Sequence, residues 1–179
     1  DDAMHFNISS PTFYILLSEF KPLTSGLYEK GVKLITIDYA RQNSEFKTTA
    51  YLNAVREINN RQKKESFFEI LYTNKGNILE CSTSNLFVFK ANKLITPKTG
   101  ILNGTMRNLV INLVKNKFIV EEKLIKIKNL DSATECFITA TNKNILPVVK
   151  INDKIIGNGK VGKNTKKIMD MLREFIDKY

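Results

Sequence analysis

The sequence predicts an α/β domain built on a mixed sheet, and the spacing of its apolar residues is the reason. Short runs rich in β-branched and aromatic residues are typical of strands, among them 32–40, 66–73 and 85–97. Two other segments, 50–64 and 164–179, repeat apolar residues at helical spacing. With 179 residues and 42% hydrophobic content, the chain can bury one sizeable core.

The first third of the chain predicts two strands, a linker and the start of a helix. The run TFYILLS at 12–18 is expected to be a strand, and a linker that contains Pro and Gly follows it at 21–30. The next strand and the helix after it leave Lys47 at the junction between them. Such a junction can hold a reactive side chain rigidly.

A β-meander is expected in the middle of the chain. The runs SFFEILYT, ILECS and NLFVFKANKLITP are separated by turn residues such as NKGN, which predicts three or four short antiparallel strands over 66–97. Glu80 falls inside one of these strands, between Leu79 and Cys81. A carboxylate buried there is costly unless it is paired, although an outward-facing side chain would avoid the cost.

The last part of the chain predicts further alternation of helices and strands. The segment 103–116 carries an apolar stripe with Asn103 as a candidate N-cap, so a helix is expected there. Short strands near 117–127, a brief helix near 130–135 and a strand at 136–140 follow. The closing helix completes a single α/β domain.

The net charge of +10, from 28 Lys and Arg residues against 18 Asp and Glu residues, could attract nucleic acid or an anionic ligand. The excess is mostly lysine interleaved with glutamate, as in KNKFIVEEKLIKIKNL at 115–130. No arginine-rich block or aromatic–basic motif accompanies it. The pattern favours a solvated lysine-rich surface over a nucleic-acid site.

Single residue types narrow the chemistry further. His5 is the one histidine of the sequence, which disfavours a histidine-based triad or metal site. Cys81 and Cys136 lie in apolar runs without CxxC spacing and are expected to be buried and reduced.

The apolar run at 13–17 is too short for a signal peptide core or a membrane span, so a cytoplasmic location is expected. The opening DDAM is typical of a processed, tagged or truncated start.

Several features of the sequence match what a pyridoxal-phosphate (PLP) enzyme requires. Lys47 offers an amine for the cofactor aldehyde, although a surface lysine fits the local sequence as well. Glu80 offers a carboxylate for the ring nitrogen. The turn NGTMR at 103–107 opens a helix whose N-terminal amides favour an anion, and the turn TATN at 139–142 offers hydroxyls and amides opposite. Tyr51, one helical turn after Lys47, could shape the pocket or simply pack in the core.

Taken together, these segments resemble the class IV aminotransferases, also called fold-type IV PLP enzymes. This family holds branched-chain aminotransferases, D-amino-acid aminotransferases and aminodeoxychorismate lyases. The resemblance runs from about residue 30 to the C-terminus, and the order and separation of its segments fit. The segments are KTTAYLNAV at 47–55, ECSTSNLFVF at 80–89, GILNGTMRN at 100–108, TATNKNILPVV at 139–149 and GKVGKNTKKI at 159–168.

The resemblance implies which residues form the cofactor site. Lys47 matches the family's Schiff-base lysine, and Glu80 matches the partner of the pyridine nitrogen. Thr105 and Met106 match the positions whose backbone amides bind phosphate, and Thr141 matches the hydroxyl residue opposite them. The implied cofactor-binding residues are Lys47, Tyr51, Glu80, Gly104, Thr105, Met106, Ala140 and Thr141, and Arg107 matches the arginine that follows the phosphate turn.

The resemblance also implies a fold and an assembly. The mixed sheet would be partly closed into a barrel with flanking helices, as in the large C-terminal domain of these enzymes. Residues 1–20 would be the last strand of a mostly missing N-terminal domain, 21–30 an interdomain linker and 31–179 the PLP-binding domain. Members of the family are usually homodimers with shared sites.

The expected activity is PLP-dependent transamination between an amino acid and a 2-oxo acid, and two alternatives stay open. Met106, in an NG-x-MR turn, is closer to aminodeoxychorismate lyases, which make p-aminobenzoate and pyruvate. Tyr51 lies one position nearer the lysine than the family's cofactor-facing tyrosine does. A non-catalytic basic fragment that binds nucleic acid or a partner is the third interpretation.

Overall fold

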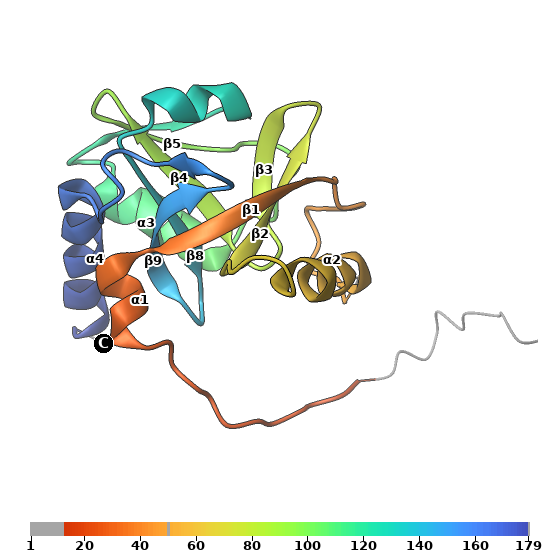
Figure 1. Cartoon of the computed structure of the whole chain (residues 1–179). Helices are drawn as coiled ribbons and strands as arrows, with labels where there is room; N and C mark the ends of the chain where they lie inside the picture. The colour runs from red at the N-terminus through yellow and green to blue at the C-terminus, as the bar shows by residue number, and fades with distance from the viewer. Residues whose placement is uncertain (1–12, 50, 179) are drawn as a thin grey trace, which may run out of the picture.

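All ten strands of the described chain join one mixed sheet. The computed structural model describes residues 13–49 and 51–178 (Figure 1). The sheet order is β6-β5-β4-β8-β9-β1-β2-β3-β7, and β10 pairs with β9 at the side. The strands are β1 (Val32–Asp38), β2 (Glu69–Asn74), β3 (Asn77–Cys81), β4 (Asn85–Lys90), β5 (Lys93–Thr96), β6 (Ile119–Glu122), β7 (Ile125–Lys126), β8 (Glu135–Ala140), β9 (Asn144–Ile151) and β10 (Lys154–Ile155). The helices are α1 (Ser25–Lys30), α2 (Leu52–Gln62), α3 (Thr105–Val114) and α4 (Lys163–Ile176), with the 3₁₀ helix η1 (Ile127–Ser132).

The strand pairing is mixed and the sheet curls. β1 runs parallel to both β2 and β9, and β5 runs parallel to β6, whereas the other pairs are antiparallel. β3 and β4 stand far apart in the sheet order, yet residues 82–84 suffice to join them because the sheet bends back on itself (Figure 1). The prediction of a mixed, partly closed sheet with flanking helices is confirmed.

The expected continuous meander from β2 to β5 is wrong in its pairing. All four strands form, but β2 pairs with β3 and β4 pairs with β5 as two separate hairpins. β8, β9 and β1 lie between these hairpins in the sheet. Five of the six residues of β4 are buried, and a strand covered on both faces belongs in the centre of a sheet.

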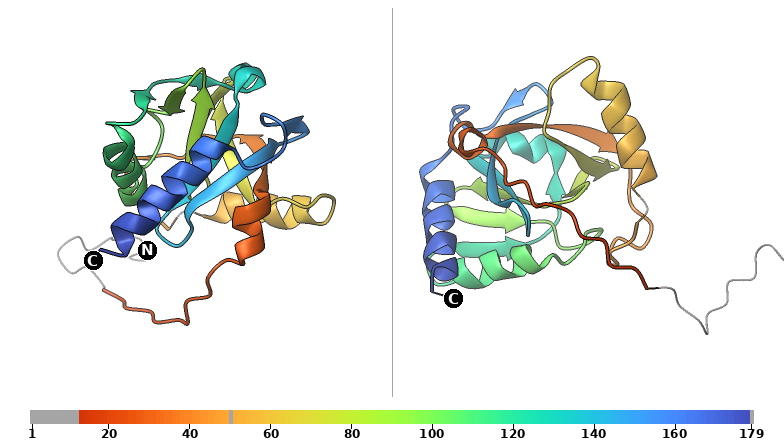
Figure 2. Two further views of the ribbon diagram at one scale, coloured as in Figure 1. Left: turned by 90° about the vertical axis from the view of Figure 1, so that its left-hand side faces the viewer. Right: turned by 90° about the horizontal axis from the view of Figure 1, so that it is seen from below.

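Two helices from the second half of the chain cover one apolar cluster. α3 and α4 pack on aromatic residues of β4 and β8, where the rings of Phe87 and Phe137 stack at 4.9 Å. Of the apolar face expected on α4, Ile168 and Leu172 are buried, whereas Ile176 is exposed. Figure 2 shows α2 on the opposite side of the sheet from α4. Within the described ranges, every helix is too short or too polar to cross a bilayer.

The start of α3 differs by one residue from the expectation. Gly104, not Asn103, is the N-cap, with φ −65° and ψ 141°, and no side chain of the described chain caps this helix. Arg107 in the first turn is 1% exposed and donates to the Pro97 carbonyl at 2.9 Å and to the Glu122 carboxylate at 2.6 Å. These bonds fix the start of α3 against the region around β5 and β6.

The N-terminal segment departs most from the prediction. Of the strand expected at 12–18, the first residue lies outside the described residues, and 13–18 pair with no strand of the described chain. Their apolar side chains are exposed, Leu16 by 92% and Leu17 by 95%, and Figure 1 shows the segment running away from the sheet. A strand needs a neighbour to satisfy its backbone groups, and none lies beside this segment in the described chain. Within the linker expected at 21–30, the short helix α1 forms.

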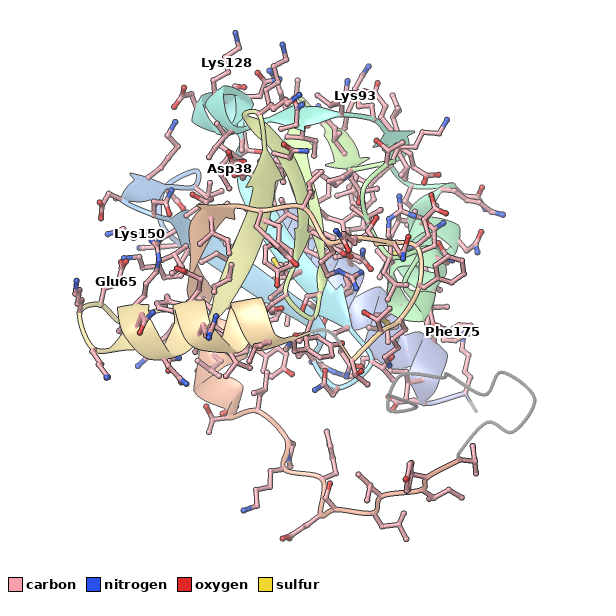
Figure 3. The ribbon with its side chains drawn as sticks, turned by 90° about the vertical axis from the view of Figure 1, so that its right-hand side faces the viewer. Asp38, Glu65, Lys93, Lys128, Lys150 and Phe175 are labelled. Carbon is pink, nitrogen blue, oxygen red and sulfur yellow. The ribbon has the colours of Figure 1, made fainter. Side chains whose placement is uncertain are left out.

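The lysine excess is spread over the surface rather than gathered in one stripe. Figure 3 labels Lys93, Lys128 and Lys150, whose side chains project from different parts of the molecule. Some of these charges pair with carboxylates, such as Lys93 with Glu121, and Lys150 with Asp153 at 3.4 Å. This is the arrangement of solvated surface charges.

Candidate functional site

A cavity of about 650 Å³ opens where the loop after β1, the loop between β3 and β4, the start of α3 and the end of β8 meet. The structure brings all eight predicted cofactor-site residues to its wall, although they come from separate segments of the chain. They are Lys47, Tyr51, Glu80, Gly104, Thr105, Met106, Ala140 and Thr141.

Lys47 lies between β1 and α2, as expected, and its side chain is exposed. Residues 39–49 and 51 form the described part of this connection, so Lys47 lies on a loop rather than at a direct strand-to-helix turn. Arg41 fixes this loop, because its guanidinium donates to the carbonyls of Ser44 at 2.8 Å and Phe46 at 3.4 Å. The Lys47 amine is therefore carried on a loop that a well-buried side chain holds.

Glu80 is buried in β3, which excludes the outward-facing alternative. Its Oε1 atom accepts a hydrogen bond from Nε of Arg41 at 2.8 Å, and Nη2 of Arg41 lies 2.6 Å from the same oxygen. Its Oε2 atom accepts from the Leu102 N–H at 2.7 Å. Burial raises the pKa of the Glu80 carboxyl, although the Leu102 N–H and the Arg41 guanidinium favour the ionised form. Arg41 was not predicted from the sequence. The available signal was indirect: a buried carboxylate such as that of Glu80 requires a cation beside it.

The turn before α3 is fixed from two sides. The N–H of Leu102 is taken by Glu80, and its carbonyl accepts from Nδ2 of Asn85 at 2.8 Å. A Cβ atom at Gly104 would lie 2.3 Å from Oδ1 of Asn85, so any other residue would have to displace the amide that holds the Leu102 carbonyl. The N–H groups at the start of a helix have no helical acceptor and carry a partial positive charge. Thr105 and Met106 present this uncapped turn to the cavity.

The opposite wall comes from the end of β8 and the turn after it. Ala140 is half-buried and Thr141 is exposed at the cavity. Thr139, just before them, also lines the cavity but is 1% exposed. Its Oγ1 atom finds no hydrogen-bond partner within residues 13–49 and 51–178.

A buried ion pair that sequence reasoning missed links two walls of the cavity. Lys143 Nζ lies 3.1 Å from Oε2 of Glu69, and both residues are less than 10% exposed. The Glu69 carboxylate also accepts from the hydroxyls of Ser82, Thr83 and Ser84 in the loop between β3 and β4. Lys143 belongs to the turn after β8, so the pair ties that turn to the loop. The charge of Glu69 within the apolar run FFEILY was a signal in the sequence for a buried pair, whereas Lys143 lies among polar residues and has no such signal.

Two aromatic residues complete the rim. Tyr51 is the N-cap residue of α2 and is half-buried at the cavity wall, so it does not lie in the interior of the core. Phe20 reaches the same cavity from the N-terminal segment and is 66% exposed. No pattern in the sequence singles out Phe20.

Comparisons with known proteins show the family to which the chain belongs. The family model described as amino-transferase class IV matches residues 3–151. The chain is 33% identical, over 94% of its length, to a protein of Methanocaldococcus jannaschii whose name places it among the branched-chain-amino-acid aminotransferases. It is 34% identical, over 83% of its length, to a D-alanine aminotransferase of Bacillus licheniformis. The chain spans 60% and 53% of the lengths of these two relatives.

Solved structures lead to the same group of proteins. One similar structure is a branched-chain aminotransferase from Thermoproteus uzoniensis with norvaline. It superimposes with a TM-score of 0.73 at 27% identity, over 83% of this chain and 52% of the other. Another is the T.th. branched-chain amino acid aminotransferase complexed with N-(5'-phosphopyridoxyl)-L-glutamate, with a TM-score of 0.76 at 25% identity over 83% of this chain and 52% of the other.

Proposed function

The chain belongs to the class IV aminotransferase family, and from this we propose that its cavity binds PLP and serves transamination between an amino acid and a 2-oxo acid. The observation that carries the proposal is the convergence on one cavity of a lysine amine, a buried carboxylate and an uncapped helix N-terminus. Because the chain spans only part of its relatives, the activity proposed is that of the whole protein.

The donor groups suit the phosphate of the cofactor at one end. The first turn of α3 offers free N–H groups at Thr105 and Met106, and the helix dipole favours an anion there. Thr141 lies across the cavity, where its hydroxyl can donate to the same anion. In the described part of the chain, Glu80 is the only acidic residue that lines the cavity, and its carboxylate is paired with Arg41 and the Leu102 N–H.

Glu80 suits the ring nitrogen of the cofactor. Its carboxylate is buried and fixed by Arg41 and Leu102, so it can hold a protonated ring nitrogen without rearranging. When bound, the cofactor supplies a conjugated ring that withdraws electrons from the bonds at the α-carbon of an attached amino acid. Glu80 would maintain that withdrawal by favouring a protonated ring nitrogen.

Lys47 supplies the reacting amine. Its side chain is exposed at the cavity, within reach of solvent and of an incoming amino acid. The Lys47 amine would hold PLP at its aldehyde group, and the same amine would carry a proton from and to the α-carbon of the substrate. Arg41 would hold the loop that carries this amine at the cavity, through its bonds to the carbonyls of Ser44 and Phe46.

We further propose that the apolar segment 13–20 packs against a preceding domain, with 21–30 as the connection to it, and that the whole protein is a homodimer. The exposure of Phe13, Leu16 and Leu17 supports a covering partner for this segment. Sedimentation of the whole protein tests the assembly directly.

An aminodeoxychorismate lyase is the second candidate. Met106 is half-buried at the start of α3, where it lines the cavity beside Thr105 and packs against the cluster under the helix. It brings an apolar side chain to this wall, as in the NG-x-MR turn of the lyases. An apolar side chain at this position is compatible with either activity, so transamination stays the main proposal.

The test uses the spectrum of the bound cofactor. Purified protein incubated with PLP should gain a visible absorbance band that hydroxylamine removes. An amino acid alone should shift the band, and 2-oxoglutarate or pyruvate should reverse the shift. Release of pyruvate from aminodeoxychorismate without any oxo acid would instead identify the lyase, and protein that never gains the band contradicts both.

A further inference from the structure

Thr139 carries the exceptional hydroxyl of the cavity. Five other Ser and Thr side chains of the described chain are comparably buried, and each donates a hydrogen bond to a carbonyl or carboxylate. They are Thr73, Ser82, Ser84, Thr96 and Thr165. Thr139 is 1% exposed, and its Oγ1 atom has no such partner in the part of the chain that the structure describes. A buried hydroxyl without a partner is unusual in a folded protein and calls for an explanation.

The position of Thr139 indicates where its partner would come from. In the sheet, Thr139 of β8 stands directly opposite Asn85 of β4, so the two side chains lie on the same face. Asn85 holds the Leu102 carbonyl and is approached closely by Gly104, the N-cap of α3. Asn85 therefore lies between Thr139 and the uncapped N-terminus of α3, and Thr139 lines the same cavity.

We infer that the Thr139 hydroxyl donates a hydrogen bond to a phosphoryl oxygen of the ligand bound at the start of α3. This inference rests on the proposed function and assigns a ligand contact to the first hydroxyl of the turn at 139–142, which is not among the eight residues predicted to bind the cofactor. The hydroxyl is held unpaired in the ligand-free protein and becomes satisfied when the anion enters. Thr139 therefore favours the bound state, because the hydrogen bond formed on binding satisfies a buried hydroxyl that otherwise has no partner.

The decisive variant is Thr139→Val, which keeps the shape of the side chain and removes the hydroxyl. The affinity for PLP and for inorganic phosphate should both fall roughly tenfold, since a bond to a charged oxygen is lost. The melting temperature of the ligand-free protein should stay the same or rise, because an unsatisfied buried hydroxyl disappears. Thr139→Ser keeps the hydroxyl and should bind both ligands within about twofold of the wild type.

Thr96→Val is the matched control. The Thr96 hydroxyl is equally buried but donates to the Leu86 carbonyl at 2.8 Å, and Thr96 does not line the cavity. This variant should lower the melting temperature of the ligand-free protein and leave both affinities unchanged. Thr139→Val should weaken binding without lowering the melting temperature, whereas Thr96→Val should lower the melting temperature without weakening binding. This difference distinguishes a hydroxyl that contacts the ligand from one that stabilises the fold.

The outcomes separate the inference from the proposed function. If the wild-type protein binds PLP and phosphate and Thr139→Val binds them equally well, the Thr139 inference is wrong while the proposed function stands. A lower melting temperature for ligand-free Thr139→Val also overturns it, because the hydroxyl would then have a structural partner. If the wild type binds phosphate through Thr139 but PLP never forms a band that hydroxylamine removes, the inference stands and the proposed function fails. Binding of neither ligand overturns both.

Discussion

Arg41 contacts Glu80 inside the cavity through two nitrogens, Nε at 2.8 Å and Nη2 at 2.6 Å from the same carboxylate oxygen. The same guanidinium donates to the carbonyls of Ser44 and Phe46, and Phe46 directly precedes Lys47. One side chain thus neutralises the carboxylate proposed for the ring nitrogen and fixes the loop that carries the proposed reacting amine. Substitution of Arg41 should therefore affect both the Glu80 carboxylate and the loop that carries Lys47.

Arg41→Met should destabilise the protein strongly. The arginine side chain is 10% exposed and that of Glu80 is 5% exposed, so the change leaves a buried carboxylate without its cation. Removal of one partner of a buried pair costs about 3 kcal/mol of unfolding free energy. Urea denaturation measures the loss. The control is Arg61→Met, which removes a surface pair with Glu57 and should cost less than about 1 kcal/mol of unfolding free energy. Equal losses for the two variants would show that the buried pair of Arg41 and Glu80 contributes no more to stability than a surface pair.

Glu80→Gln should separate cofactor binding from turnover. The variant keeps the phosphate contacts and Lys47, so PLP should still bind. Turnover should fall by about 10²–10³-fold, because a neutral amide does not keep the ring nitrogen protonated. Single-turnover kinetics of the PLP-loaded whole protein measure the chemical step apart from binding. Wild-type rates in this variant would show that Glu80 does not interact with the ring.

Lys47 should be the residue that attaches to PLP. Borohydride reduction of the PLP-treated protein, followed by peptide mapping, should locate the pyridoxyl group on Lys47. Lys143 is an internal control, because its amine lies near the same cavity but is held by Glu69 and Ser84. A label on Lys143 or on any other lysine would end the assignment, and Lys47→Ala should leave the protein unlabelled.

Cys81 and Cys136 should not react with thiol reagents in the folded protein. Burial raises the pKa of both thiols above the ordinary value, so the reactive thiolate is scarce at about pH 8. Both should react at once in denaturant. Because unfolded thiols ionise near pH 8.5 while the folded ones stay protonated, the stabilising contribution of these groups is complete below that pH and is lost as the pH rises further. Rapid labelling of native protein would show that Cys81 is open to the cavity.

Most of the fold could be predicted from the sequence because it depends on local signals, whereas the eight predicted residues that line the cavity were implied by the resemblance of short segments to a known family. Strands, helices and the turn at Gly104 are encoded by apolar spacing and by short motifs. The partner of Glu80 and the pairing of the hairpins depend on contacts between distant segments, and neither Arg41 nor the order of β4 and β8 has a local signature. The strand expected at 12–18 carries a strong local signal, but in 13–18 it lacks, within the described chain, the neighbour that a strand requires.

The buried pair of Glu69 and Lys143 should hold the shape of the cavity without touching a ligand. Lys143→Met leaves the Glu69 carboxylate buried and uncompensated, so unfolding free energy should fall by about 3 kcal/mol. Hydrogen exchange should increase in the loop at 82–84 and in the turn at 140–143, because the pair is the link between them.

The double variant Glu69→Gln/Lys143→Met tests the coupling. With both charges removed, the amide can still accept from the Ser and Thr hydroxyls, and the uncompensated charge is gone. The double variant should therefore be more stable than Lys143→Met alone, and a double-mutant cycle should give a coupling energy of about 1–3 kcal/mol. Lys154→Met breaks an exposed pair with Asp131 and serves as the control that should change neither stability nor exchange. Additive losses in the cycle would mean that Glu69 and Lys143 act separately on their two loops.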